Sequence, residues 1–145
     1  MIRKFVIAAT LAAASFGAVA APAAANDIFI NQWGWNHSAG GHQSGWGNKI
    51  GIHQNGWRNS TSNNQYGHGN TAATGQEGRR NSAETWQYGN NNQAGVGQFG
   101  SNHTSILTQD GNGNVAAGVQ VGNGCSANVD QYGSGNVAAF VQVCP

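Results

Sequence analysis

The 145-residue chain has room for one domain, carries only 8% charged residues and contains 23 Gly. The formal net charge is only +1, and the sequence shows no cluster of Lys and Arg. This excludes a protein that binds nucleic acid through a basic surface. A composition rich in Gly, Asn and Gln is typical of prion-like disorder, but a strict sequence period argues against a disordered chain.

Residues 1–25 differ in composition from everything that follows. A short basic start precedes an Ala-rich apolar run over residues 5–20, and small residues continue to Ala25. This pattern predicts a secretory signal peptide over residues 1–25. A membrane anchor is the alternative, but the run is short and Ala-rich. Cleavage after Ala20 or Ala25 fits the A-x-A rule, and Ala25 is favoured because the repeats begin at Asn26. Export would place the chain in an oxidising compartment.

Residues 26–142 repeat with a period of 11, and only Gln93 of the 12 Gln lies off this lattice. With the repeated Gln as position 1, Gly occupies position 3, and Asn and Ala occupy positions 6 and 8 in seven of ten units. Only a repeated structural unit produces such a register. The Gln on the lattice are Gln32, Gln43, Gln54, Gln65, Gln76, Gln87, Gln98, Gln109, Gln120, Gln131 and Gln142.

The repeat predicts strands rather than helices. A helix would contain at least one Gly per unit, each costing about 1 kcal/mol relative to Ala. In an extended chain, positions 6, 8, 10 and 1 share one face, and positions 2–5 suit a tight bend. The bend Gly are Gly34, Gly45, Gly56, Gly67, Gly78, Gly89, Gly100, Gly111, Gly122 and Gly133. The expected strands are 26–32, 37–43, 48–54, 59–65, 70–76, 81–87, 92–98, 103–109, 114–120, 125–131 and 136–142.

Two successive strands that face each other across a bend would form one rung of two units. Each strand would then stack about 4.8 Å from the strand two units further along the chain. The prediction is an all-β, two-sheet β-solenoid of 11-residue strand–bend units, with 22-residue rungs, about five in number, over residues 26–145. A meander of hairpins is the alternative, but it would place unlike strands side by side.

Inward Asn and Gln side chains would be unfavourable in isolation, since an unpaired buried amide costs about 1–3 kcal/mol. Stacked on identical neighbours, each amide can donate to one neighbour and accept from the other. We therefore expect inward ladders of the Gln given above and of the Asn at position 6. These Asn are Asn48, Asn59, Asn70, Asn81, Asn92, Asn114 and Asn136.

The pattern Q-x-G-x-x-N-x-A-x-x-x-Q resembles the curlin repeat of curli fibre subunits, which are secreted bacterial functional amyloids. The unit from Gln65 through Gly67, Asn70 and Ala72 to Gln76 matches it in full. The resemblance implies a β-solenoid that stacks on itself and on a related curlin subunit into extracellular fibres at the bacterial surface. It further implies export by outer-membrane curli secretion and accessory proteins, and roles in biofilm matrix and adhesion. It leaves open whether the chain is a major or a nucleating subunit.

The end strands carry unpaired backbone groups, which are an open template for another chain. No charged or Pro-rich cap precedes Asn26, and apolar residues gather near both ends, including Ile28, Ile30 and Phe140. We expect these edges to direct assembly. A monomer with blocked ends is the alternative.

Cys125 and Cys144 would meet at one edge of the last rung, which predicts a disulfide that closes a loop of about 20 residues. Two free thiols are the alternative.

Trp35, Trp46 and Trp57 occupy position 4 of successive bends. They would either bind glycans, dyes and neighbouring fibres or simply cover the corners.

No catalytic, metal or cofactor site is indicated by the sequence. The five His and the scattered carboxylates show no ligand spacing and no nucleophile–base pair. We therefore expect neither an enzyme nor a small-molecule substrate. The rival function is a monomeric adhesin or ice-binding solenoid, suggested by an outward column at position 7 of alternate strands. That column is Ser38, Ser60, Ser82, Thr104 and Ser126.

Overall fold

The computed structural model describes residues 25–145. The signal peptide predicted for residues 1–25 lies, apart from Ala25, outside the described residues. Within the described part, no helix is long and apolar enough to cross a membrane.

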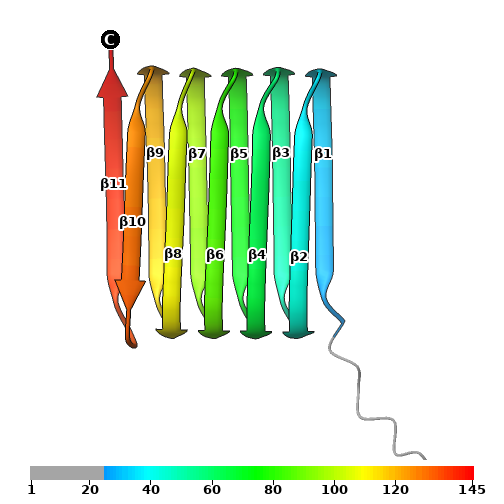
Figure 1. Cartoon of the computed structure of the whole chain (residues 1–145), viewed down its shortest axis with the longest axis vertical. Coiled ribbons are helices and arrows are strands. Elements are labelled where there is room, and N and C mark those ends of the chain that lie inside the picture. Colours follow the sequence, from blue (N-terminus) through cyan, green and yellow to red (C-terminus); the bar gives the residue numbers. More distant parts are fainter. Residues whose placement is uncertain (1–24) are drawn as a thin grey trace, which may run out of the picture.

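The described chain consists of eleven strands that wind into a flat solenoid (Figure 1). The strands are β1 (Asp27–Trp35), β2 (Ser38–Trp46), β3 (Lys49–Trp57), β4 (Ser60–His68), β5 (Thr71–Arg79), β6 (Ser82–Asn90), β7 (Gln93–Ser101), β8 (Thr104–Asn112), β9 (Val115–Asn123), β10 (Ser126–Tyr132) and β11 (Val137–Cys144).

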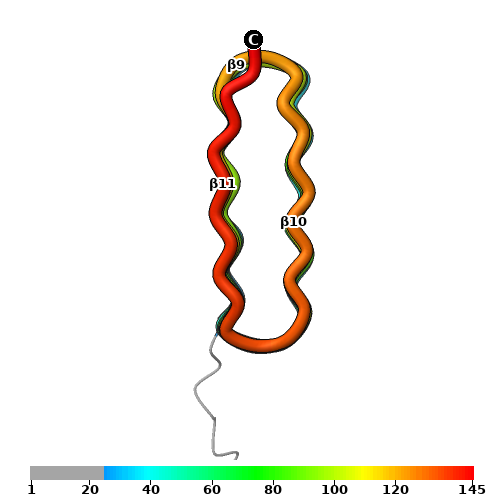
Figure 2. The backbone as a smooth tube through the Cα atoms, turned by 90° about the vertical axis from the view of Figure 1, so that its left-hand side faces the viewer, coloured from blue at the N-terminus to red at the C-terminus, as the bar shows by residue number. Residues whose placement is uncertain are grey.

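Two parallel sheets face each other, and each strand pairs with the next strand but one along the chain. Sheet A has the order β1-β3-β5-β7-β9-β11, and sheet B has the order β10-β8-β6-β4-β2. Gln32 is opposite Gln54 in sheet A, and Gln43 is opposite Gln65 in sheet B. Viewed along the solenoid axis, the rungs superpose on one another (Figure 2). The predicted all-β, two-sheet solenoid with two units per rung is confirmed, and the hairpin meander is wrong.

The strand boundaries differ from the prediction. Strands were expected at positions 6 to 1, but they begin at position 7 and nine of them continue through position 4. The bend is therefore reduced to positions 5 and 6, because the bends of successive rungs stack on one another and extend the pairing. Trp35 and Trp57, for example, are register partners at the ends of β1 and β3.

Two backbone positions turn the chain at each bend. Gly78, at position 3, has a φ of 121°, and a Cβ placed there would overlap the carbonyl oxygen of Gly100 in the next rung. Position 5 is also left-handed in all ten bends, with Gly, Asn or Arg in that place; Arg80, for example, has a φ of 54°. Gly and Asn tolerate this conformation best. The repeated Gly at position 3 is required by the close stacking of the bends as well as by its φ.

The space between the two sheets contains two small apolar clusters of side chains. One contains Ile50, Ile52 and Ala72, and the other is centred on Leu107 and Val96, with Val129 and Phe140 packed against it. Leu107 is completely buried, so apolar packing is not confined to the terminal strands as the sequence pattern suggested. Thr and Asn occupy much of the core between these clusters.

Asn63 in this polar middle region offers a test of core packing. The side chain is fully buried, its Oδ1 accepts from Thr74 Oγ1 at 3.3 Å, and its Nδ2 has no partner. Replacing Asn63 with Thr removes the unpaired donor and should raise the free energy of unfolding by about 1 kcal/mol. Guanidinium unfolding would measure this change. Asn55→Thr, at an exposed position, is the control and should leave the midpoint nearly unchanged.

Candidate functional site: the open ends of two glutamine ladders

Two continuous ladders of Gln side chains run through the solenoid, one from each sheet. In each of nine consecutive pairs, Nε2 of one Gln donates to Oε1 of the stacked Gln in the next rung, at 2.7–2.9 Å. Nε2 also donates to a backbone carbonyl of the facing strand, as from Gln54 to the Ser38 oxygen at 3.0 Å. All donors point the same way along the axis. The ladders therefore give the solenoid a direction.

The Asn side chains at position 6 do not form the expected ladder of amide on amide. Asn70 Oδ1 instead accepts from the backbone N–H of Asn92, and Asn70 Nδ2 donates to the backbone carbonyl of Gly89. These Asn lie at the bend rather than in the strand, so their side chains satisfy backbone groups that the turn leaves unpaired. The expectation of an Asn–Asn ladder is therefore wrong, although all of these Asn except Asn136 are buried in columns along the bends.

Where His occupies position 6 in place of Asn, its ring nitrogens bind a backbone N–H and a backbone carbonyl, as the Asn amide does. His103 Nδ1 accepts from the backbone N–H of Cys125, and its Nε2 donates to the carbonyl of Phe99. His37 makes the equivalent contacts with the Asn59 N–H and the Trp33 carbonyl. These partners require the neutral tautomer with the proton on Nε2. The sequence showed only a departure from the repeat at these positions, and the side-chain replacement was not predicted.

The N-terminal end of the solenoid is formed by β1 and β2, whose outer edges have no strand partner within the described residues. Gln32 Oε1 and Gln43 Oε1 begin the two ladders, so this end presents two amide acceptors. Ile28 and Ile30 of β1 are 47% and 42% exposed, whereas Ile50 and Ile52 in the same columns of β3 are buried. The N-terminal end therefore exposes apolar side chains at positions that a neighbouring rung covers in the interior of the solenoid.

The C-terminal end is formed by β10 and β11, and it presents the complementary groups. Gln131 and Gln142 end the ladders, and each Nε2 uses one N–H on a backbone carbonyl and retains the other. Phe140 is half-buried, and its ring lies over Gly118, where an added Cβ would overlap it. Val137 and Val141 are 77% and 74% exposed on the outer face. One end thus presents acceptors and the other presents donors.

A disulfide joins Cys125 to Cys144 at the C-terminal end, with Cα atoms 5.6 Å apart. It links the residue before β10 to the end of β11 across the last rung. Reduction should lower the free energy of unfolding by about 3 kcal/mol, because the loop of 19 residues is then free in the unfolded chain. Guanidinium unfolding with and without reductant would measure this effect. A Cys125→Asn, Cys144→Ser variant should not respond to reductant, and an equal response from it would contradict the assignment.

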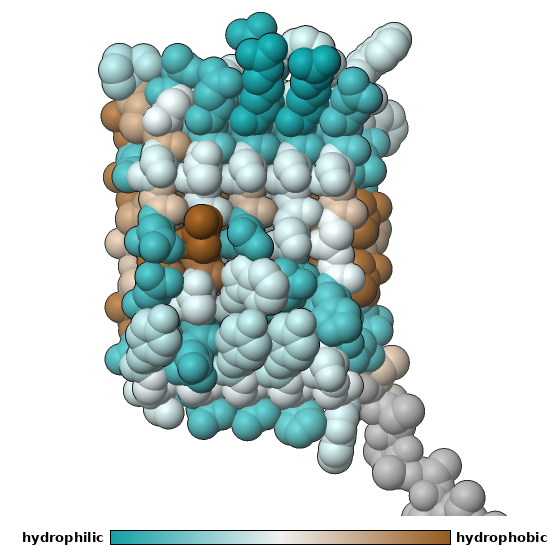
Figure 3. All heavy atoms as spheres, in the orientation of Figure 1, coloured by the Kyte–Doolittle hydropathy of each residue, from teal (hydrophilic) through white to brown (hydrophobic). Residues whose placement is uncertain are grey.

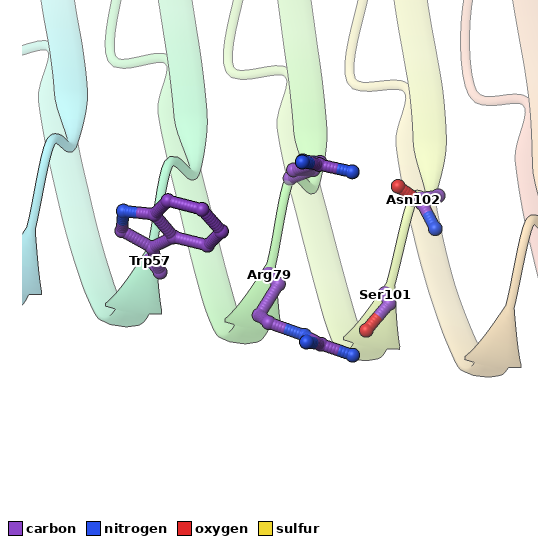
Figure 4. Close-up of a pocket in the computed structure, with 5 residues that line it drawn as sticks. Trp57, Arg79, Ser101 and Asn102 are labelled. Carbon is purple, nitrogen blue, oxygen red and sulfur yellow. The ribbon is translucent and has the colours of Figure 1, made fainter.

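Three Arg side chains gather at one corner of the solenoid, although the sequence suggested no basic patch. The Arg58 guanidinium lies 4.4 Å and that of Arg80 5.6 Å from the centre of the Trp57 ring. Arg79 is the register partner of Trp57, and Figure 4 shows both beside Ser101 and Asn102. The stacking of each bend on the next bend but one brings these side chains together. Trp57 is 36% exposed, against 79% for Trp35 in the same column.

The outer faces of the two sheets differ. Sheet B carries the exposed column of Ser and Thr at position 7 and a stack of Tyr66 on Tyr88 with ring centres 5.1 Å apart. Figure 3 shows this face as largely hydrophilic. On the outer face of sheet A, small residues such as Ala73, Gly95 and Ala117 follow one another at position 9 and form a flat apolar strip.

Among residues 25–145, no three His, Cys, Asp or Glu side chains come close enough together to hold a metal ion. The features that stand out chemically are the amide ladders and the strand edges at which they end. These features are suited to pairing with another β-strand rather than to catalysis.

Residues 78–111 and 106–133 match the family model of the curlin associated repeat. No curated protein matches the sequence. The two matched segments extend from the end of β5 to the bend after β10, and the strands before them continue the same register and the same Gln ladders. The chain therefore contains curlin associated repeats over residues 78–133.

Proposed function

We propose that this protein is a secreted structural subunit that assembles end to end into curli-like amyloid fibres on the bacterial surface. Secretion depends on the predicted signal peptide over residues 1–25. The proposed partners are further copies of the chain, a related curlin subunit, and the outer-membrane secretion and accessory proteins. Biofilm matrix and surface adhesion are the proposed roles of the fibre.

The observation that carries this proposal is the complementarity of the two ends. Acceptors of Gln32 and Gln43 at one end match donors of Gln131 and Gln142 at the other. Both ends also expose strand edges that have no partner within the described residues. A second copy placed on either end continues the sheets with the same hydrogen bonds that hold the interior together.

A monomeric adhesin or ice-binding solenoid is the second candidate, and one observation favours it. The column of Ser38, Ser60 and Ser82 continues through Thr104 to Ser126 in register on the exposed face of sheet B. The adjacent outward column at position 9 mixes Gly, Ser, Glu, Ile and Asn, so a second regular column is missing. The open ends are also unexplained by a monomer.

Incubation of purified residues 26–145 with an amyloid dye, followed by electron microscopy, tests the proposal. We expect a lag, a rise in fluorescence and unbranched fibres whose diffraction shows a meridional spacing of about 4.8 Å. Seeds of preformed fibre should remove the lag. A protein that stays monomeric at high concentration, with native β-structure by circular dichroism, would overturn the fibre proposal and favour the monomeric candidate.

A further inference from the structure

The described chain contains an odd number of strands, so its two sheets are unequal. Sheet A has six strands and sheet B has five. Each 11-residue unit is related to the next by a half-turn about the solenoid axis and by a rise of half the strand spacing, about 2.4 Å. Eleven units therefore end half a rung away from where they began. β11 projects beyond β10 at the C-terminal end.

A second copy can meet this uneven end in two ways. If the second copy has the same orientation as the first, β1 of the second copy pairs with β11 of the first. The strand position beside β10 in sheet B then stays empty. Turned by half a revolution about the axis, its β1 pairs with β10 and its β2 pairs with β11. The half-turn exchanges the two sheets and reverses the strand direction, so both new pairs are parallel, as are all pairs within the subunit.

We infer that successive copies of this chain in the fibre are related by a half-turn about the fibre axis, with β1 of one copy on β10 of the previous copy and β2 on β11. This inference rests on the proposed function. The partner is a second copy of the same chain, and the interface is formed by the strand edges β10 and β11 at one end and β1 and β2 at the other.

Register supports the half-turn, because the repeat then continues through the junction without interruption. Gln131 meets Gln32 of the next copy, and Gln142 meets Gln43, so the free N–H of each ladder end finds an acceptor. In the unrotated arrangement only Gln142 finds a ladder partner, on Gln32. Gln131, which is 7% exposed, and Gln43 of the next copy then face an empty strand position.

The inward side chains also favour the half-turn. Val129 would stack on Ile30 of the next copy and Phe140 on Gly41, whose missing side chain leaves room beside the aromatic ring. Ile28 lies close to Gly41 within its own subunit and would close the remaining space. Without the half-turn, Phe140 stacks on Ile30 and Val129 is left uncovered. An uncovered apolar strand at every junction would lose the burial that drives assembly.

Cryo-electron microscopy of fibres of residues 26–145 tests the inference without any substitution. The half-turn predicts a rotation of about half a revolution per subunit and a rise of about 26 Å, which is eleven half-spacings. The unrotated arrangement predicts no such rotation and a rise of about 29 Å, with one strand position empty in sheet B at each junction. Unrotated fibres would overturn the half-turn alone. Failure to form fibres would overturn the proposed function and the half-turn with it.

Two pairs of Cys substitutions provide an independent measurement. Val137 and Ser38 are outward-facing neighbours only with the half-turn, and Val137 and Asp27 only without it. A stacked pair lies about 4.8 Å apart, within the Cα range of a disulfide. We expect oxidised fibres of the Val137→Cys, Ser38→Cys variant to yield covalent multimers at least ten-fold above the Val137→Cys, Asp27→Cys variant on a non-reducing gel. Val137→Cys alone controls for exchange with the native disulfide, and the reverse preference would overturn the half-turn.

Discussion

Replacing Ala139 and Val141 with Pro should stop fibre growth while leaving the folded subunit intact. The N–H of Val115 donates to the carbonyl of Asn136, toward the C-terminal end. Because every second residue of a strand points the same way, the N–H groups of Ala139 and Val141 point away from β9, to the open edge. Both side chains are exposed, so the substitutions remove edge donors without disturbing the core.

Seeded growth, followed by dye fluorescence and microscopy, measures this effect. The variant retains an intact N-terminal end, so it should add once to the C-terminal end of a wild-type fibre and then block it. We expect no net elongation from the variant alone, and inhibition of wild-type growth at a tenth of the wild-type concentration. The matched control, Ala139→Thr with Val141→Thr, keeps both N–H groups and should elongate. Equal growth of the two variants would show that this edge does not take part.

Replacing Gln76 with Leu should destabilise the subunit by about 4 kcal/mol, since several buried polar groups lose a partner at about 1–3 kcal/mol each. Gln76 is fully buried, accepts from Gln54 Nε2 and Thr61 Oγ1, and donates to the Ser60 carbonyl and to Gln98 Oε1. Leu has nearly the same size, so the loss measures the hydrogen bonds rather than a cavity. Denaturant unfolding gives the change directly.

The chain contains its own control for this substitution. Gln93, the single Gln outside the repeat, lies exposed on β7, and Gln93→Leu should change the free energy of unfolding by less than about 0.5 kcal/mol. Gln32→Leu, at the exposed start of a ladder, should give an intermediate loss, because its amide makes a single ladder bond. If Gln76→Leu and Gln93→Leu had equal effects, the ladders would not contribute to stability.

The period of the sequence was enough to predict the solenoid, because 11-residue units with one inward face can be satisfied only by stacking on identical neighbours. The same logic correctly placed Gln54 on Gln76. It failed for Asn70, whose side chain is just as regular in sequence but bonds to the backbone of the bend. A periodic pattern identifies which residues stack, but it does not show whether a side chain bonds to its equivalent or to the main chain.

Contacts between units of different composition were not predictable in the same way. Arg58, Arg79 and Trp57 fall in two different repeats, and nothing in either repeat indicates that the three side chains lie together. Their proximity depends on strand pairing that extends to position 4, which makes Arg79 the register partner of Trp57, and the predicted strands ended at position 1. The complementarity of the two ends likewise required the direction of the ladder hydrogen bonds, since the sequence does not tell which way an amide donates.

The two sheets share their inward residues and differ in their outward ones, and this asymmetry bears on how the gene can change in length. Tandem duplication of a single 11-residue unit would preserve every core column, because Gln, Asn and Ala recur in both sheets. It would also move all later strands to the opposite sheet. From that point on, the Ser column at position 7 would continue on sheet A and the small residues at position 9 on sheet B. Duplication of a complete rung, which is two units, changes neither. A lineage that relies on its outer faces is therefore expected to gain and lose units in pairs.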